Sequence, residues 1–255
     1  MAQTEKKDNP NNSFFDGYYK EIWKQVFPPE TTSKETDYII AECNLQKGDH
    51  VLDIMCGYGR HALELARREM HVTAVDNLPD YISEIEEASK KEKLFIDCLL
   101  DDVLQVKLNR QFDAAICMGN SLQFFDTDDC LKLLRSVSSS LKPGAKLIIN
   151  TWSIAEIIYK NFRGSSFSKI DNKIFLTESQ FLLKPARIEV QSTIISENGI
   201  REEKKGVDYI YSLNELESML NQSGFILKEV YSVPGKKKFT PGEPRAYIVA
   251  EKSAL

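Results

Sequence analysis

One glycine-bearing segment between two apolar runs constrains the fold of this chain more than any other feature. Residues 51–62 read VLDIMCGYGRHA, and a second run, VTAVD at 72–76, ends in the acidic residue Asp76. This order predicts a buried strand, a tight turn, a helix and a second strand that ends in a carboxylate. Glycines let backbone N–H groups come close to a ligand, and the carboxylate can accept hydrogen bonds from ribose hydroxyls. We therefore predict a binding site for a nucleoside-containing cofactor.

Length and composition place the chain among soluble globular proteins. Its 255 residues suit one large α/β domain with an elaboration, and contents of 42% hydrophobic and 28% charged residues are ordinary for such a protein. No apolar run reaches the roughly 18 residues of a membrane span, so no membrane association is expected. The net charge of −5 disfavours a nucleic-acid surface, which needs a basic field.

The N-terminus and the cysteines indicate a cytoplasmic protein. Residues 1–12 are polar and lack the apolar core of a signal peptide, so we expect a disordered tail there. The five cysteines form no C-x-x-C pair, and most of them lie in apolar segments. This pattern is typical of buried, reduced thiols, and it predicts no metal site.

Strand and helix patterns alternate after residue 50. Strands are expected near 50–54, 71–76, 94–99, 112–118 and 145–150, with helices near 60–69, 79–91 and 128–141. Strands separated by helices predict parallel β-α-β crossovers. Before them, residues 13–46 should form lid helices: one at 14–27 with an aromatic stripe, and one that opens with the capping-box pattern TSKE at 32–35.

The alternation stops after residue 160. Three antiparallel strands are expected next, at 173–183, 187–196 and 200–211. Asn198–Gly199 is a strong hairpin signal between the last two. We therefore predict an inserted antiparallel β subdomain over residues 161–206.

The α/β pattern resumes after the insertion. Residues 47–160 and 207–255 are expected to form one α/β domain, in which a capping box at Ser212 opens a further helix. Strands near 225–232 and 245–251 finish the chain. Because no helix fits between them, they should pair antiparallel.

Asp53 discriminates between two kinds of nucleoside site. Residues 57–62 also fit G-x-G-x-x-A, a short pattern that occurs in nicotinamide-binding folds. A carboxylate four residues before Gly57 is not expected where the turn wraps only a pyrophosphate. It is expected where the ligand presents a cationic ammonium group near the turn.

At this point the segment Asp53-x-x-Cys56-Gly57-x-Gly59 resembles the first motif of class I S-adenosylmethionine-dependent methyltransferases. One departure is that Met55 stands where the family usually has glycine. Because the other motif residues are kept, we expect a tight turn with slightly altered packing and with ligand binding retained.

Further segments resemble later motifs of the same family. Residues 112–125 resemble the fourth motif, 141–144 the turn before strand five, and 245–252 the terminal strand. The resemblance covers about residues 14–160 and 207–251. It implies a Rossmann-like, seven-stranded, mostly parallel sheet whose last strand is antiparallel.

The resemblance also implies S-adenosyl-L-methionine as the cofactor and assigns its contacts. Asp53 and the glycine turn would hold the methionine portion, and Asp76 the ribose. Asp102 or Asp101, with the Val103 backbone, would hold the adenine. The full set of expected cofactor-binding residues is Asp53, Met55, Cys56, Gly57, Gly59, Asp76, Asn77, Asp101, Asp102, Val103, Met118, Gly119 and Asn120.

The same resemblance favours a small-molecule methyl acceptor, with nitrogen preferred over oxygen. The chain lacks the Asn/Asp-Pro-Pro-Tyr/Phe loop of nucleic-acid amino methyltransferases and the Pro-Cys dipeptide of cytosine-C5 enzymes. Residues 119–121 resemble glycine N-methyltransferases, but Trp152 stands where those enzymes have a carboxylate-binding arginine, which suits an apolar or cationic acceptor. Substrate-site candidates are Ser121, Gln123 and Trp152, and candidates for a catalytic role are Tyr18, Tyr19 and Asn120.

Two other functions are compatible with the sequence. One is an NAD(P)-dependent oxidoreductase, against which Asp53 and residues 112–125 argue. The other is a cofactor-binding protein without catalytic activity, which Met55 and the missing arginine leave open. A monomer or a homodimer is expected, since the edge of the inserted sheet could pair with a second copy.

Overall fold

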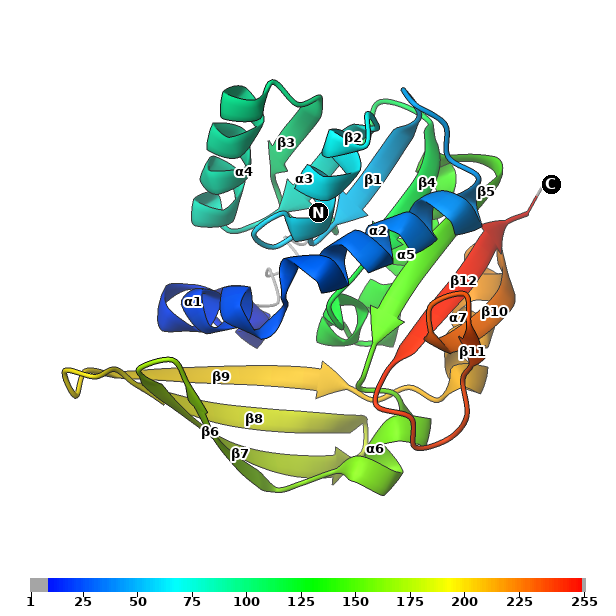
Figure 1. Ribbon diagram of the computed structural model, residues 1–255. Coiled ribbons are helices and arrows are strands. Elements are labelled where there is room, and N and C mark those ends of the chain that lie inside the picture. The colour runs from blue at the N-terminus through cyan, green and yellow to red at the C-terminus, as the bar shows by residue number, and fades with distance from the viewer. Residues whose placement is uncertain (1–8, 254–255) are drawn as a thin grey trace, which may run out of the picture.

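A mostly parallel sheet of eight strands forms the centre of the computed structural model, which describes residues 9–253 (Figure 1). From edge to edge the strands are β11 (Lys237–Lys238), β10 (Phe225–Val233), β12 (Ala246–Lys252), β5 (Leu141–Thr151), β4 (Phe112–Cys117), β1 (His50–Ile54), β2 (His71–Asp76) and β3 (Ile96–Leu100). The last strand, β12, is antiparallel to both of its neighbours, as predicted. The predicted count of seven strands is wrong by one, because the two-residue strand β11 joins the edge and is too short to leave a sequence pattern.

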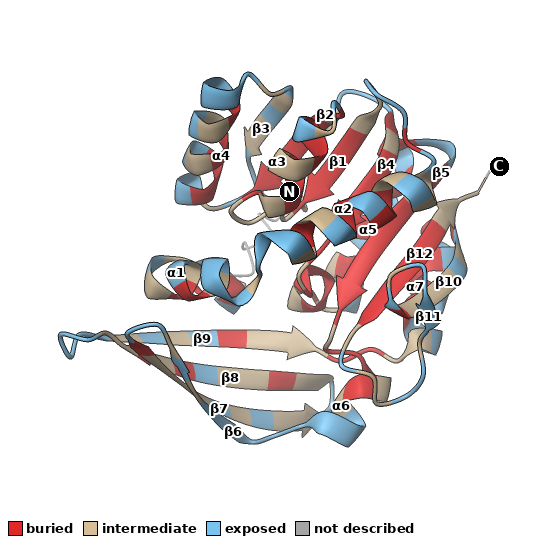
Figure 2. Cartoon of the chain, viewed as in Figure 1, coloured by how far each residue is buried: buried red, intermediate tan, exposed pale blue. Residues whose placement is uncertain are grey.

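Helices cover both faces of this sheet. One face carries α2 (Pro29–Cys43), α3 (Arg60–Arg67) and α4 (Pro79–Glu92), and the other carries α5 (Thr127–Ser140) and α7 (Leu213–Gln222). Successive side chains of a strand point to opposite faces, so Val51 packs in the first core and Leu52 in the second. The central strands β1, β2 and β4 are therefore buried on both sides (Figure 2), which explains why their sequences are continuous apolar runs.

Most helix predictions are confirmed. The helices expected at 60–69, 79–91 and 128–141 each begin and end within two residues of the observed α3, α4 and α5. The predicted capping box of Ser212 with Glu215 is also present. The predicted start of α2 was wrong. The helix begins at Pro29, so the TSKE segment lies inside the helix and does not cap it. Within the described part of the chain, no helix has both the length and the apolar character that a membrane crossing needs.

A second, antiparallel sheet lies beside the first. Its strands, in spatial order, are β6 (Ser165–Ile170), β7 (Lys173–Leu183), β8 (Ala186–Ile195) and β9 (Arg201–Tyr209). The predicted hairpin is confirmed, since Gly199 adopts a φ of 78° between β8 and β9. The sequence did not predict β6, or the helix α6 (Ala155–Asn161) that leads into this sheet. β6 is mostly exposed and reads SSFSKI, which lacks a clear buried face.

The N-terminal segment is more ordered than predicted. Residues 1–8 of the expected tail lie outside the described residues, but a short 3-10 helix, η1 (Pro10–Ser13), is present. The Asn9 side-chain amide donates to the Phe124 carbonyl at 2.9 Å, and the Asn11 amide donates to the Val207 carbonyl at 2.9 Å. The following helix, α1, spans Gly17–Val26, so Phe14 and Phe15 precede it.

Helix α1 lies between the two sheets (Figure 1). On one side, Lys20 and Lys24 each form an ion pair of 2.5 Å with Glu84 of α4. On the other side, Lys173 of β7 pairs with Glu21 at 2.8 Å. The aromatic stripe of α1 is thereby held against the inserted sheet and over the carboxyl ends of the central strands.

Candidate functional site

A cavity of about 670 Å³ opens at the carboxyl ends of β1, β2 and β4. It collects eleven of the predicted site residues: Asp53, Met55, Cys56, Gly57, Asp76, Asn77, Asp102, Val103, Met118, Gly119 and Ser121. Parallel strands end at the same edge of a sheet, and ligands of such folds bind there. The motifs are separated in sequence but are brought together by this common strand direction.

Seven predicted residues do not line the cavity: Tyr18, Tyr19, Gly59, Asp101, Asn120, Gln123 and Trp152. Gly59 is the N-cap of α3, with a φ of 77°. A Cβ there would lie 2.7 Å from Ile85 Cδ1 on α4, and closer still to Cγ1. Its place in the motif is therefore explained by the packing of α3 against α4.

The turn between β1 and α3 uses left-handed backbone at three positions. Met55, Gly57 and Gly59 have φ values of 56°, 57° and 77°. Met55 thus keeps the conformation that glycine adopts easily, at a cost of about 1–2 kcal/mol for a residue with a side chain. Its side chain packs against the core, which agrees with the expectation of a tight turn with altered packing.

Asp76 ends β2 and faces the turn. Its Oδ2 atom accepts the backbone N–H of Gly57 at 2.8 Å, and Oδ1 accepts that of Leu78 at 3.0 Å. Burial raises the pKa of the carboxyl, while these backbone donors oppose the shift. Each oxygen keeps a second lone pair, so the carboxylate can still accept hydroxyl groups from a ligand.

Asp53 is a buried carboxyl without a full set of partners. It is 2% exposed, and its Oδ2 atom has no hydrogen-bond partner among residues 9–253. Burial, with the nearby Asp76 charge, raises its pKa to about 8, although Arg60 and the Ala62 backbone lower it. A buried polar atom without a partner is costly. A cationic group in the cavity would provide that partner.

The two adjacent aspartates after β3, Asp101 and Asp102, differ in their position relative to the cavity. Asp102 lines the cavity, whereas Asp101 is exposed and its carboxylate accepts the Asp102 backbone N–H at 2.8 Å. Asp102 Oδ1 in turn accepts the Leu104 N–H at 3.0 Å. The cavity-facing member of the pair is therefore Asp102, followed by Val103 and Leu104.

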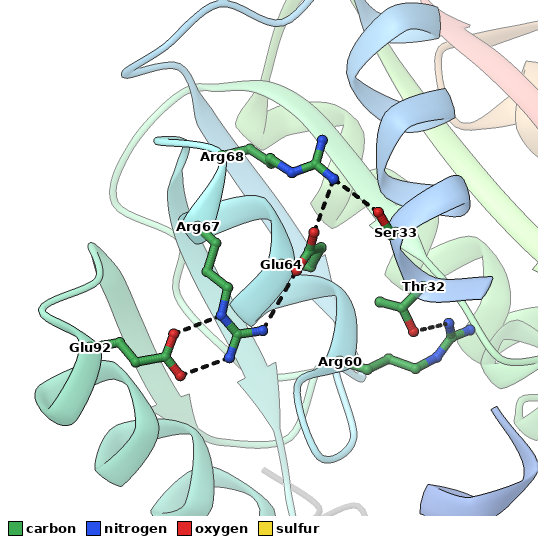
Figure 3. Close-up of polar contacts among 7 residues, drawn as sticks. All are labelled: Thr32, Ser33, Arg60, Glu64, Arg67, Arg68 and Glu92. Atoms are coloured by element: carbon green, nitrogen blue, oxygen red, sulfur yellow. Dashed lines mark hydrogen bonds and ion pairs between the residues drawn. The ribbon is translucent and has the colours of Figure 1, made fainter. Parts of the chain in front are cut away.

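A buried ionic network connects α2 to the start of α3. Glu35 accepts hydrogen bonds from Arg60 at 2.5 Å, His61 at 3.0 Å and the Tyr247 hydroxyl at 2.6 Å. Arg60 also reaches Thr32 at 3.1 Å (Figure 3). The side chains of the TSKE segment therefore hold α3, whereas its sequence predicted a helix cap.

Protonation in this network follows from burial. Burial opposes ionisation of Glu35, but the hydrogen bond from His61, the Arg60 charge and the Tyr247 hydroxyl outweigh it and lower its pKa to about 2. Burial and the Arg60 charge lower the His61 pKa to about 4. At neutral pH Glu35 is thus a carboxylate paired with Arg60, and His61 is a neutral donor. Arg60 and His61 both line the cavity.

Aromatic side chains form part of the cavity wall. Phe15 and Trp23 come from the N-terminal lid segment, whose aromatic stripe was predicted from the sequence. Trp23 stacks on Tyr19 with 5.6 Å between ring centroids, and it lies 5.9 Å from Trp152. The candidates Tyr19 and Trp152 therefore lie behind Trp23.

Asn120 is fully engaged in a polar cluster. Its side-chain oxygen accepts the Thr151 hydroxyl at 2.9 Å and the backbone N–H groups of Trp152 at 2.9 Å and Ser153 at 3.0 Å. Its amide donates to the Ser153 hydroxyl at 3.0 Å and to Asp208 Oδ2 at 3.1 Å. These bonds tie Asn120 to β5 and β9, and Asn120 itself does not line the cavity. Sequence reasoning missed Asp208 entirely.

Comparison with known proteins identifies the α/β core. Residues 51–144 match the family model described as "Methyltransferase domain". Residues 51–144 thus form a methyltransferase domain. The resemblance seen in the motifs is thereby confirmed.

Two curated relatives align with this methyltransferase domain. A glycine/sarcosine N-methyltransferase of Aphanothece halophytica is 26% identical over 160 residues, which are 61% of this chain and 60% of that enzyme. A ubiquinone biosynthesis O-methyltransferase of Xanthomonas campestris is 32% identical over 117 residues, 45% of this chain and 47% of that enzyme. The chain thus matches less than two thirds of the length of either relative.

A solved structure shares the architecture more completely. An S-adenosylmethionine-dependent methyltransferase from Clostridium acetobutylicum superposes with a TM-score of 0.79, covering 92% of this chain and 96% of that one. The two sequences are 21% identical, so the likeness shows a shared fold.

Proposed function

We propose that the chain is a methyltransferase that transfers the methyl group of S-adenosyl-L-methionine to a nitrogen or oxygen atom of a small molecule. The observation that carries the proposal is the unpartnered Asp53 oxygen in the cavity wall. The α-ammonium group of the cofactor fits this atom, whereas the anionic pyrophosphate of a nicotinamide cofactor would be repelled by it. The N- and O-methyltransferase relatives support both kinds of acceptor atom.

The other cavity residues suit the remaining parts of the cofactor. Asp76 would accept hydrogen bonds from the ribose hydroxyls while it continues to hold the Gly57 turn. Asp102 and the Val103 backbone, at the end of β3, would take the adenine. Met118 and Gly119, after β4, lie where the transferred methyl group is expected.

The sulfonium of the cofactor supplies an already activated methyl group. The task of the chain is to hold the acceptor atom in line with the S–CH₃ bond and to exclude water. Trp23 and Phe15 form an apolar wall suited to excluding water. The ion pairs of Lys20 and Lys24 with Glu84 hold this wall in place.

Calorimetric titration tests the cofactor assignment. We expect S-adenosylmethionine and its demethylated product, S-adenosylhomocysteine, each to bind with a stoichiometry of one, and NAD⁺ not to bind. Binding of NAD⁺ without binding of either sulfur nucleoside would overturn the proposal.

Methyl transfer is tested separately with a panel of small amines and alcohols. Release of S-adenosylhomocysteine in step with methylated product is expected for at least one of them. Tight cofactor binding without transfer to any member of the two acceptor classes would support a cofactor-binding protein without catalytic activity.

A further inference from the structure

We propose that the methyl acceptor is an amine that binds as an ammonium ion, and that Asp208 of the inserted sheet holds it and accepts its proton. The inference rests on the proposed methyltransferase function and names the substrate class of the same site. It concerns a residue that no sequence motif identifies.

Among residues 9–253, only one of the two Asp208 carboxylate oxygens accepts hydrogen bonds. Its Oδ2 atom accepts the Ser153 hydroxyl at 2.7 Å and the Asn120 amide at 3.1 Å. No hydrogen bond to Oδ1 is found among residues 9–253, and the residue is only partly buried. The carboxylate is therefore fixed in orientation, with one oxygen left to bind a ligand.

Asp208 lies against the loop that follows β4. It touches Asn120, whose chain neighbours Gly119 and Ser121 both line the cavity. Asn120 has a φ of 70° and donates its backbone N–H to Asn150 at 3.0 Å. Asp208 does not itself line the cavity, but its carboxylate contacts the loop residue that stands between two residues that do.

The hydrogen-bond partners of this carboxylate carry no positive charge. Ser153 and Asn120 are neutral donors, in contrast to the Arg60 that pairs with Glu35 elsewhere in the site. A nearby positive charge favours the ionised form of a carboxylate whose other partners are neutral. An ammonium ion supplies that charge, whereas an alcohol supplies only a neutral donor.

Aromatic rings complete the environment that a cation needs. Burial raises the pKa of the Tyr19 hydroxyl, and the Asp208 charge adds to the rise. Tyr19 stacks on Trp23, which lines the cavity and approaches Trp152. Aromatic faces stabilise ammonium groups.

The proposed step moves one proton to Asp208 and one methyl group to the acceptor nitrogen. The ammonium nitrogen gives one proton to Asp208 Oδ1 and gains a lone pair. That pair forms the N–C bond to the methyl carbon as the C–S pair moves onto sulfur, which loses its positive charge. The proton on Asp208 then leaves to water, so one acceptor ammonium and one sulfonium give one methylated ammonium, one neutral thioether and one proton.

The protonation state of Asp208 agrees with this role. Burial raises its pKa, and the Ser153 and Asn120 hydrogen bonds oppose the rise, which leaves it at about 6. The group is therefore ionised at neutral pH, and its affinity for a proton is higher than that of an ordinary aspartate. Both properties suit a general base near pH 7.

Two ring-matched probes test the proposal directly. Cyclohexylamine hydrochloride and cyclohexanol differ in the amine and hydroxyl groups alone, and binding to the protein saturated with S-adenosylhomocysteine can be followed by tryptophan fluorescence. The chain has two tryptophans, Trp23 and Trp152, which lie 5.9 Å apart beside this site. We expect saturable binding of the amine, at least tenfold tighter than that of the alcohol.

Variants assign the preference to Asp208. Asp208→Asn should weaken amine binding at least tenfold, abolish the preference over cyclohexanol and leave calorimetric binding of S-adenosylhomocysteine unchanged. Glu203→Gln, at an exposed position on the same strand, should leave the binding of both probes and of S-adenosylhomocysteine unchanged. The melting temperature of each variant reports whether it folds.

Three outcomes separate the possible failures. Equal binding of the two probes by the wild type overturns the amine assignment without needing any variant. An unchanged preference in folded Asp208→Asn overturns the role of this residue. Failure of the wild type to bind S-adenosylhomocysteine instead overturns the methyltransferase proposal itself.

Discussion

The Asp76 carboxylate accepts the backbone N–H of Gly57 with 2.8 Å between Oδ2 and N. The residue proposed to hold the ribose therefore also holds the turn proposed to hold the methionine portion. Because its other oxygen accepts Leu78 N–H at 3.0 Å, the carboxylate fixes the ends of both β1 and β2. The two halves of the proposed cofactor site are thus coupled through one side chain.

Replacing Asp76 by asparagine should disturb both halves together. The amide keeps one acceptor, and its NH₂ group must face one of the two backbone donors, Gly57 or Leu78. We expect the dissociation constant of S-adenosylhomocysteine to rise at least tenfold, or about 1.4 kcal/mol. Calorimetry measures this change, with the exposed neighbour of the site, Asp101→Asn, as control. Equal affinities of the two variants would count against our placement of the ribose.

Cofactor affinity should depend on pH through Asp53. Burial raises the pKa of this carboxyl to about 8, so it is protonated in the free protein below that pH. A bound ammonium group favours the ionised form, and binding therefore releases a proton below about pH 8. Affinity should increase as pH rises toward 8, by at most about tenfold per pH unit.

The Asp53→Asn variant separates this effect from titration of the cofactor. It lacks the ionisable group, so its affinity should be weaker at pH 8 and less dependent on pH between 6 and 8. Calorimetry in two buffers of different ionisation enthalpy measures the released protons. Identical pH profiles for wild type and variant would contradict the assignment of Asp53 to the ammonium group.

The sequence predicted the central sheet and the carboxylates that line the cavity at its edge, for a physical reason. Strands buried on both faces must be apolar throughout, and residues that follow parallel strands must meet at one edge. Asp53, Asp76 and Asp102 are separated by long stretches of chain, but all three line the cavity. Local order along the chain was enough to place them.

The parts that the sequence did not predict depend on distant contacts or on weak patterns. Glu35 meets Tyr247 across 212 positions, and no local signal distinguishes that role from a helix cap. Asp208 lies on a half-exposed strand whose charged neighbours gave no hint of its contact with Asn120. β6 was missed because an exposed strand needs no apolar periodicity.

Gly59→Ala should destabilise the protein through packing as well as backbone strain. The residue has a φ of 77°, and a Cβ would collide with Ile85. Gly144→Ala is the matched control, since its φ is 76° and no heavy atom lies within 4 Å of the added carbon. We expect Gly59→Ala to lose about 1–3 kcal/mol more than the control in urea unfolding. Equal losses would show that α3 and α4 can separate without cost.

Glu35→Gln should remove the charge that pairs with the buried Arg60. The ion pair is 2.5 Å long, and the two side chains are 4% and 12% exposed. Breaking a buried pair from one side costs about 3–5 kcal/mol, because the other charge is left without a counter-charge. Glu92→Gln, which removes the exposed partner of Arg67 (Figure 3), should change the unfolding midpoint little.

The pH dependence of this loss distinguishes charge pairing from a change in packing. The pKa of Glu35 is lowered to about 2 in the folded chain, below its ordinary value of 4.5, so its contribution to stability is complete above pH 4.5. It declines as pH falls from there toward 2. In urea unfolding, the difference between wild type and Glu35→Gln should therefore be largest at pH 7 and should shrink at pH 3. A difference that stays constant between these pH values would assign the loss to packing and would contradict the ionic role of Glu35.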